Sequence, residues 1–263
     1  MSTLKLPMYQ VDAFAGRVFT GNPAAVCPLE SWLPDAQMQS IAAENNLAET
    51  AFFVKNGSGY KLRWFTPAVE VDLCGHATLA SASVILNDIT PGERSVSFET
   101  KSGTLTVTRE GDLYSLDFPA RPPEVCANVY PGLVAAVGGK PETVLAAQDY
   151  FLVYGSEDEL RSLRPDMAAL MNIDRFAVIV TAPGREFDFV SRFFAPAKGV
   201  PEDPVTGRAH CSLIPYWSKR LGKKKLHAHQ ASPRGGEVWC EDRGERVTIS
   251  GKAVRFFEGS IFL

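Results

Sequence analysis

The sequence lacks several patterns that mark large classes of proteins. Its five cysteines form no CxxC pair, which disfavours a structural metal site or a redox disulfide and favours a reducing, intracellular setting. No apolar stretch is long enough to span a bilayer, and residues 1–11 lack the basic and then apolar run of a signal peptide. The net charge is -3, and the one basic run, residues 223–225, is short. We therefore expect a soluble, cytoplasmic protein that binds neither nucleic acid nor membrane.

What the sequence does contain is a duplicated motif. Residues 63–68, Arg-Trp-Phe-Thr-Pro-Ala, are followed by Cys-Gly-His-Ala at 74–77, and residues 192–197, Arg-Phe-Phe-Ala-Pro-Ala, are followed by the polar segment 202–209. Each copy is typical of a strand, a polar loop and a glycine that opens a helix. Because 263 residues suffice for two domains of ordinary size, the duplication predicts two similar lobes.

The two helix-opening glycines, Gly75 and Gly207, indicate where an anion could bind. The first turn of a helix carries backbone N–H groups without intrahelical partners, at the positive end of the helix dipole. Such a position suits a carboxylate. Two lobes related by rough two-fold symmetry would direct both helix starts into one cleft.

Apolar periodicity and turn signals predict an α+β fold. Expected strands in the first half lie near residues 8–14, 50–54, 60–65, 95–99, 104–109 and 114–118, and in the second half near 150–154, 176–181, 188–194, 236–240 and 246–250. Helices are expected from residue 34 to about 45, over 75–87, from a capping box at 156–159, and over 207–218, where Pro215 should kink or shorten the helix.

The segment 75–87 has small or apolar residues on every face and no charge, which predicts a helix buried all round. We expect two pseudo-symmetric lobes, each a curved mixed or antiparallel sheet wrapped around a central buried helix. The N-terminal lobe should span residues 1–118, completed by a C-terminal strand at 253–263. The C-terminal lobe should span residues 119–252.

Glu49 enters an otherwise apolar strand. Burial penalises an unpaired carboxylate, so its pKa should rise and the group could both remove and return a proton. The alternative is a glutamate at a strand edge that faces water or pairs with an arginine.

Two residues at the start of the first buried helix could also carry chemistry. His76 could donate to a substrate anion or relay a proton, or it could be a structural histidine bonded to a carbonyl. Cys74 could be a thiolate activated by the helix start and His76, or a cysteine that serves only packing.

The second half of the sequence also contains candidate site residues. Asp203 could orient His76, share a proton with Glu49, or shape an Asp-Pro turn. Thr206 and Gly207 could supply a hydroxyl and an N–H to an anion, or be an N-cap and its first turn. In the first half, Asn22 lies in a Gly-Asn-Pro turn signal whose amide could reach a ligand.

His227 and His229 alternate on a predicted strand, so both should face one side. That spacing could ligate zinc, but no third ligand is evident in the sequence.

Five motifs in the same order, at residues 20–26, 46–52, 74–78, 199–207 and 232–236, resemble those of the PhzF-like isomerases of phenazine biosynthesis. The resemblance runs from about residue 9 to 262. It implies the fold of diaminopimelate epimerase, commonly a homodimer, and proton-transfer catalysis in the interlobe cleft without cofactor or metal. By motif, Glu49 is the acid and base, His76 and Asp203 assist, and the backbone at Gly75 and Gly207 holds a substrate carboxylate.

This chain departs from the family pattern at two positions. Arg208 stands where the phenazine enzyme has serine, and it could bind an additional acidic group or fill the pocket. Residues 204–206 stand where the epimerases have a second catalytic cysteine, which disfavours two-thiol racemisation. The expected function is therefore an isomerase that moves a proton on a small carboxylate-bearing substrate. The alternatives are an epimerase that uses Cys74 as one base, and a non-catalytic protein that binds a small acid or a partner.

Overall fold

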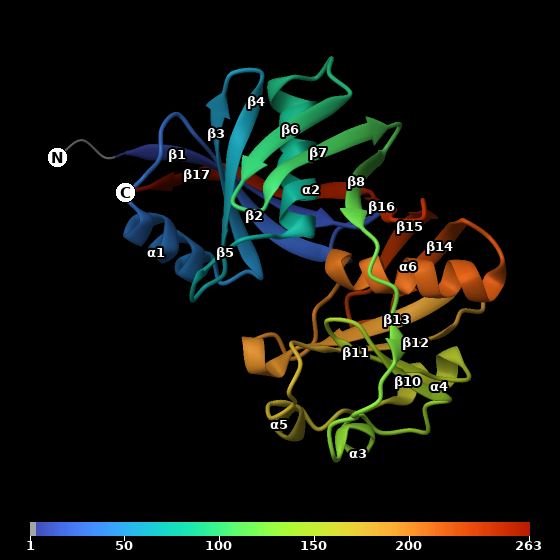
Figure 1. Ribbon diagram of the computed structural model, residues 1–263. Coiled ribbons are helices and arrows are strands. Elements are labelled where there is room, and N and C mark those ends of the chain that lie inside the picture. Colours follow the sequence, from blue (N-terminus) through green and yellow to red (C-terminus); the bar gives the residue numbers. More distant parts are fainter. Residues whose placement is uncertain (1–3) are drawn as a thin grey trace. The chain divides into compact units, whose positions relative to one another are not determined.

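A computed structural model describes residues 4–263, which form two units (Figure 1). The first unit consists of residues up to 117 together with 250–263, and the second of residues 118–249. Both units combine a mixed sheet with a few helices, so the predicted α+β class is confirmed. Among the residues described, none of the helices combines the length and apolar character needed to cross a membrane.

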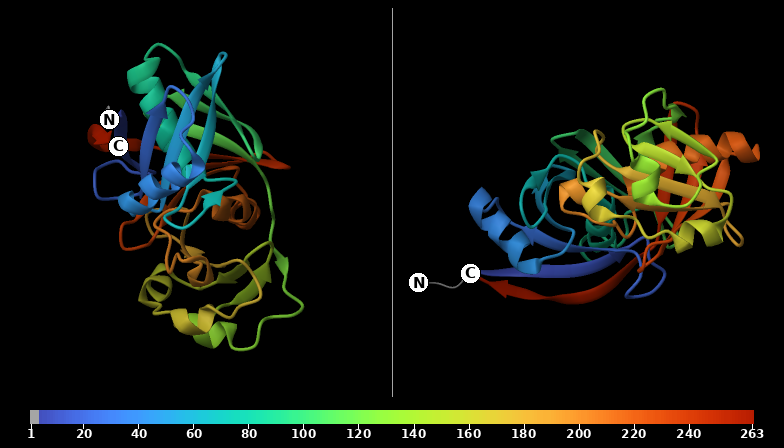
Figure 2. Two further views of the ribbon diagram at one scale, coloured as in Figure 1. Left: turned by 90° about the vertical axis from the view of Figure 1, so that its left-hand side faces the viewer. Right: turned by 90° about the horizontal axis from the view of Figure 1, so that it is seen from below.

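The first unit is a mixed sheet with two helices of more than two turns. Its elements are β1 (Lys5–Ala13), β2 (Asn22–Leu29), α1 (Asp35–Asn45), β3 (Glu49–Asn56), β4 (Gly59–Phe65), β5 (Glu70–Val71), α2 (Gly75–Val84), η1 (Ile85–Ile89), β6 (Ser95–Thr100), β7 (Gly103–Glu110), β8 (Leu113–Pro119) and β17 (Ala253–Phe262). β2 pairs antiparallel with β1 and parallel with β3, and β4 pairs antiparallel with β3 and parallel with β6. The C-terminal strand β17 pairs antiparallel with β1, and the two lie side by side in Figure 2.

α2 is the central helix of the first unit. All its residues except Gly75 are buried, as the uncharged segment predicted. Ala and Ser side chains occupy much of its surface, so the strands of the sheet can pack close to it. α2 contacts β1, β2, β3, β7 and β17, which fixes the position of its first turn within the sheet.

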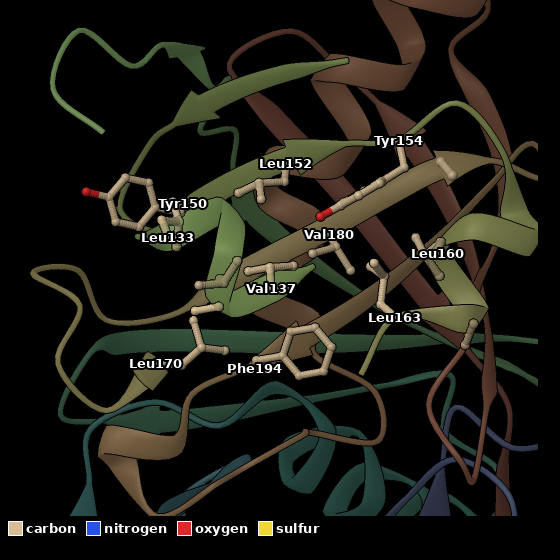
Figure 3. Close-up of a cluster of buried hydrophobic side chains, with 14 of the residues drawn as sticks. Leu133, Val137, Tyr150, Leu152, Tyr154, Leu160, Leu163, Leu170, Val180 and Phe194 are labelled. Atoms are coloured by element: carbon tan, nitrogen blue, oxygen red, sulfur yellow. The ribbon is translucent and has the colours of Figure 1, made fainter. Parts of the chain in front are cut away.

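The second unit repeats this arrangement with different details. Its elements are β9 (Glu124–Val125), α3 (Leu133–Val137), β10 (Thr143–Ala146), β11 (Tyr150–Val153), α4 (Glu157–Ser162), α5 (Met167–Leu170), β12 (Val178–Pro183), β13 (Phe189–Phe194), η2 (Pro196–Lys198), α6 (Gly207–Leu221), β14 (Lys225–Gln230), β15 (Gly236–Asp242) and β16 (Arg246–Gly251). β11 and β12 are parallel, β12 and β13 antiparallel, and β13 and β14 parallel. Figure 3 shows part of its apolar core, in which Tyr154, Val180 and Phe194 are fully buried.

α6 differs from the sequence prediction because it continues through Pro215 to Leu221. Pro215 removes one backbone donor, but packing beyond it holds the helix. The Trp217 ring is buried and stacks on Phe189 at 5.6 Å, and its indole N–H donates to Thr181 Oγ1 at 2.9 Å. The predicted shortening at Pro215 is therefore wrong.

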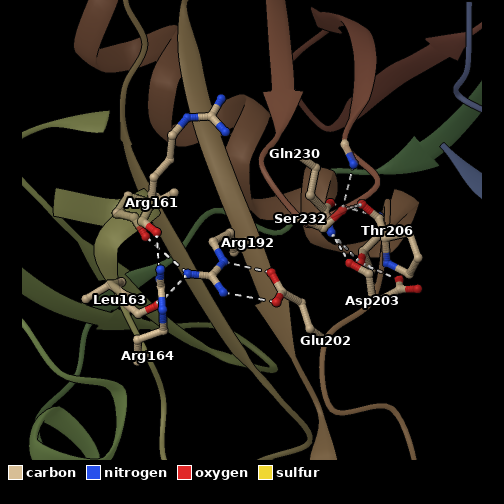
Figure 4. A network of polar contacts seen from close by, with 12 residues as sticks. Arg161, Leu163, Arg164, Arg192, Glu202, Asp203, Thr206, Gln230 and Ser232 are labelled. Carbon is tan, nitrogen blue, oxygen red and sulfur yellow. Dashed lines mark hydrogen bonds and ion pairs between the residues drawn. The ribbon is translucent and has the colours of Figure 1, made fainter. Parts of the chain in front are cut away.

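The duplicated motif corresponds to a duplicated ion pair. In β4, Arg63 Nε and Nη2 donate to the two carboxylate oxygens of Glu70 at 2.7 and 2.9 Å. In β13, Arg192 Nε and Nη2 donate to both oxygens of Glu202 at 2.7 and 3.0 Å (Figure 4). Each arginine thus anchors the loop between a strand and the start of a central helix. A bidentate pair of this geometry limits how far the loop can move.

Candidate active site

Four of the predicted site residues meet in the first unit. Glu49 is the first residue of β3, Cys74 and His76 flank Gly75 at the start of α2, and Asn22 begins the neighbouring strand β2. Glu49 Oε2 lies 3.1 Å from His76 Nε2, and Cys74 Sγ lies 3.5 Å from His76 Nδ1. Asn22 Nδ2 lies 3.3 Å from the same Nδ1 atom. His76 is therefore the centre of the group.

The group is largely shielded from water. The side chains of Glu49 and His76 are 19% and 8% exposed, and Asn22 and Cys74 are buried. Charge interactions are stronger where water is excluded, so the ion pair has a large effect on both of its partners.

The ionisation of Glu49 differs from the prediction. Burial alone raises the pKa of its carboxyl, but the positive charge of His76 and the polar contacts with His76 and Cys74 outweigh burial, and the pKa is lowered. The predicted rise is wrong because the sequence showed the apolar strand but not the imidazole that the fold brings to it. Glu49 is a carboxylate at neutral pH.

His76 has the complementary shift. Burial opposes protonation of the imidazole, but its interactions with Cys74 and with the Glu49 carboxylate outweigh burial and raise the pKa of His76 above its ordinary value. Burial and the charge of Glu49 also raise the pKa of the Cys74 thiol. The group at neutral pH is thus an imidazolium, a carboxylate and a thiol.

His76 and His210 should titrate in different ranges. We expect His76 to keep its proton well above its unfolded pKa of about 6.5, whereas burial lowers the pKa of His210 to about 4. Because the folded pKa of His76 is raised, its contribution to stability is complete below the unfolded pKa and is lost as pH rises through the folded value. NMR titration of the imidazole signals measures both, and a His76 that deprotonates at or below its ordinary pKa would contradict the ion pair.

The predicted residues of the second unit form a separate polar network at the start of α6 (Figure 4). Thr206 Oγ1 donates to Asp203 Oδ2, so the hydroxyl is occupied by Asp203 and does not cap the helix. Gln230 accepts from Thr206 N–H at 2.8 Å and donates to the Asp203 carbonyl at 2.8 Å. Gly207, the first residue of α6, is buried. Whether this network and Glu49 serve one cleft stays a prediction.

Gln230 is the residue of this network that sequence reasoning missed. It is fully buried at the end of β14 and holds the loop from Asp203 to Thr206 through three hydrogen bonds. A glutamine at the end of a strand is unremarkable in sequence, and only the fold shows that its amide serves a loop 24 residues away.

Arg208, the main departure from the family pattern, binds a carboxylate of its own unit. Its Nη2 donates to Asp149 Oδ1 at 2.6 Å, and the guanidinium lies 4.0 Å from the centre of the Phe176 ring. The side chain is 34% exposed, whereas that of Asp149 is 6% exposed. The guanidinium therefore compensates a buried charge, a role that neither sequence alternative included.

We expect Arg208→Ser to destabilise the protein by about 2 kcal/mol, because a buried carboxylate that loses its charged partner keeps its desolvation penalty. Burial raises the pKa of Asp149 and the charges of Arg208, Arg121 and Arg175 oppose that rise, so the two remaining arginines limit the loss. Denaturant unfolding measures the effect, and Arg185→Ser, which breaks an exposed pair with Asp158, is the control. Equal stability of the Arg208 variant and the wild type would contradict this role.

The alternative zinc site at His227 and His229 is not supported. Both side chains contact Phe187 and so share a face, as predicted. His227 pairs with Glu237 at 3.0 Å, and His229 lies 3.4 Å from Arg161. Within residues 4–263, the one group of three such side chains close enough to hold a metal is elsewhere, at Glu49, Cys74 and His76.

Comparison with known proteins identifies the family. Residues 11–259 match the phenazine biosynthesis-like protein family. An uncharacterized isomerase of Pseudomonas aeruginosa is 52% identical over 260 residues, which cover 99% of this chain and all of that protein. The crystal structure of a PhzF-family phenazine biosynthesis protein from Enterococcus faecalis has a TM-score of 0.96 and 50% identity, and covers 99% of this chain and 100% of its own. The chain therefore belongs to the phenazine biosynthesis-like family, as its motifs predicted.

This protein resembles the epimerases in its fold. The structure of a predicted epimerase from Pseudomonas aeruginosa has a TM-score of 0.71 at 19% identity, covering 97% of this chain and 99% of its own. This confirms the predicted epimerase-like fold. Together with the relatives named isomerases, the family supports isomerase activity as the general class.

Proposed function

We propose that this protein is a cofactor-independent isomerase that moves a proton on a small carboxylate-bearing substrate, with Glu49 as the acid and base. The observation that carries the proposal is the largely buried contact of 3.1 Å between Glu49 Oε2 and His76 Nε2 at the start of the central helix. Relatives named isomerases support the reaction class.

The charge state of the pair suits the first step. Glu49 Oε2 is buried 3.1 Å from His76 Nε2, and a carboxylate oxygen has a second lone pair besides the one that faces the imidazolium. The atom is therefore a carboxylate oxygen with a lone pair available to take a proton from a substrate C–H bond. The electron pair of that bond stays on the substrate, where a neighbouring carboxylate or double bond delocalises it.

The second step returns the proton to another carbon. Once Glu49 is neutral, its attraction to the imidazolium of His76 is lost, and this loss favours giving the proton back. His76 and the N–H groups at the start of α2 stabilise the negative charge that develops on the substrate between the two steps. General acid and base catalysis of this kind is worth about a hundredfold to ten-thousandfold in rate.

The remaining roles extend the proposal. Asn22 positions His76 at Nδ1, where the amide oxygen, turned toward the ring, accepts from the imidazolium N–H. Asp203, Thr206 and Gly207 assist in binding the substrate and its carboxylate, and the protein acts as a homodimer. These assignments rest on the motifs and stay predictions.

The test is hydrogen exchange in heavy water. Small hydroxy and amino acids that raise the melting temperature are incubated with protein dialysed against a chelator, and deuterium incorporation at carbon is followed by NMR. Incorporation supports proton transfer without a metal. Tight binding without exchange would refute catalysis and favour a protein that only binds small acids.

An epimerase that uses Cys74 as a base is the second candidate, because the Cys74 thiol lies next to His76. The raised pKa of this thiol argues against it. With Glu49 as the base, we expect Cys74→Ser to exchange no more than about tenfold more slowly than the wild type, since a lost packing or hydrogen-bond contact costs about 1 kcal/mol. Complete loss of exchange in a folded Cys74→Ser protein would favour the epimerase.

A further inference from the structure

We propose that Glu49, Cys74 and His76 also form a binding site for one thiophilic divalent cation, Zn²⁺ in the first place, and that the bound ion inhibits the enzyme. The inhibition rests on the proposed function, whereas the binding site rests on geometry alone. One ligand atom from each of the three side chains lies within 4.8 Å of the other two.

The donor set selects the ion. A thiolate, an imidazole nitrogen and a carboxylate oxygen are the ligands that Zn²⁺ combines in proteins, whereas Mg²⁺ and Ca²⁺ prefer oxygen alone. Three protein ligands leave a fourth tetrahedral position for water or a substrate oxygen.

The ligand distances fit a tetrahedral ion at Glu49 and His76, and the Cys74 side chain has to move to complete the site. Zinc bonds of about 2.0 to 2.3 Å place neighbouring ligand atoms about 3.3 to 3.6 Å apart. Glu49 Oε2 and His76 Nε2 are 3.1 Å apart, and Cys74 Sγ and His76 Nε2 are 4.0 Å apart. The separation of the oxygen and the nitrogen is close to what zinc requires. Cys74 Sγ lies nearer Nδ1, at 3.5 Å, so the thiolate has to move along the ring toward the Nε2 side to reach the ion.

The neighbouring Asn22 can support the ligated histidine. A metal on Nε2 requires the proton of the ring to be on Nδ1, where an acceptor normally holds it. The Asn22 amide lies 3.3 Å from Nδ1, and rotation of the amide by half a turn presents its oxygen to that proton. Nδ1 carries a proton in the imidazolium as well as in the zinc complex, so the amide with its oxygen toward Nδ1 suits both states.

The ion would inhibit because it occupies the same oxygen and nitrogen that the reaction uses. A Glu49 carboxylate bound to zinc cannot take a proton, and His76 as a neutral ligand cannot stabilise a developing anion as an imidazolium. Zinc and turnover therefore exclude each other at this site.

The binding test uses Cd²⁺, whose bond to a thiolate gives an ultraviolet charge-transfer band. Titration of the full, chelator-treated chain should show one Cd²⁺ per chain, and Zn²⁺ should displace it. Cys74→Ser should abolish the band, while Cys126→Ser, which removes a partly exposed cysteine elsewhere, should keep it. Glu49→Gln and His76→Asn should each weaken binding about a hundredfold, which tests the site even if the Cys74 variant does not fold.

Three results would overturn the proposal. They are the absence of a band in the wild type, a band that persists in folded Cys74→Ser, and a bound ion that leaves the exchange rate unchanged. Exchange by the wild type in chelator tests the proposed function without any metal, so the two proposals can fail independently.

Discussion

Glu49→Gln is expected to reduce proton exchange by about a hundredfold to ten-thousandfold while the protein still folds. Glutamine has the size of glutamate but cannot accept a proton at neutral pH. The variant also removes the negative charge 3.1 Å from His76 Nε2. Burial of the imidazole then opposes its protonation with less compensation, so the pKa of His76 should fall in the same variant.

The two readouts separate catalysis from structure. Glu44→Gln, an exposed glutamate in α1, is the matched control and should leave both the exchange rate and the His76 titration unchanged. A Glu49→Gln protein that exchanges at the rate of the wild type would remove Glu49 from the mechanism. A lowered His76 pKa with normal exchange would leave the ion pair as a purely structural contact.

Much of the fold follows from local signals in the sequence. The turn residues at 57–58, 101–102 and 111–112 join paired antiparallel strands, and each hairpin has a glycine of positive φ, at Gly57, Gly103 and Gly111. Ser156 caps α4 by accepting from Glu159 N–H, as the capping box predicted. These elements depend on residues that are close in sequence, so pattern reasoning finds them.

The strand β2 was not predicted, because Pro23 and Pro28 are unusual inside a strand that is paired on both sides. Its pairing with β1 and β3 overrides that local preference. The predicted turn at Asn22 is therefore the buried beginning of a strand, and this position is what brings the Asn22 amide to His76.

The ionisation states and ion-pair partners of the site residues were harder to predict than which residues form the site. The motifs named Glu49, Cys74 and His76, and the structure brings the three together. The direction of the Glu49 pKa shift depends on its 3.1 Å contact with His76, which is distant in the sequence. The Arg208 pair with Asp149 spans 59 positions. Such contacts decide ionisation, and no local pattern contains them.

The second large effect is expected at the repeated arginine. Arg192→Met should destabilise the protein by about 3 to 5 kcal/mol, the range for a buried ion pair that loses one partner. The Arg192 side chain is 10% exposed, and besides Glu202 it donates to the carbonyls of Leu160 and Leu163 at 3.2 and 3.0 Å. Methionine fills part of the space but leaves all these acceptors without their donor. Urea unfolding followed by circular dichroism measures the loss.

Arg63→Met is the matched control from the other copy of the motif, and its effect should be smaller, about 1 to 2 kcal/mol. Glu70 also pairs with Lys101 at 2.7 Å, so it keeps a cation when Arg63 is removed.

Adding Glu202→Gln to Arg192→Met should restore part of the lost stability, because the second change removes the unpaired buried charge. Equal losses in the two arginine variants, or no recovery in the double variant, would mean that packing rather than charge dominates at Arg192. The loop that Arg192 anchors through Glu202 continues directly into Asp203, so the stability of this pair also determines how firmly the predicted assisting carboxylate is held.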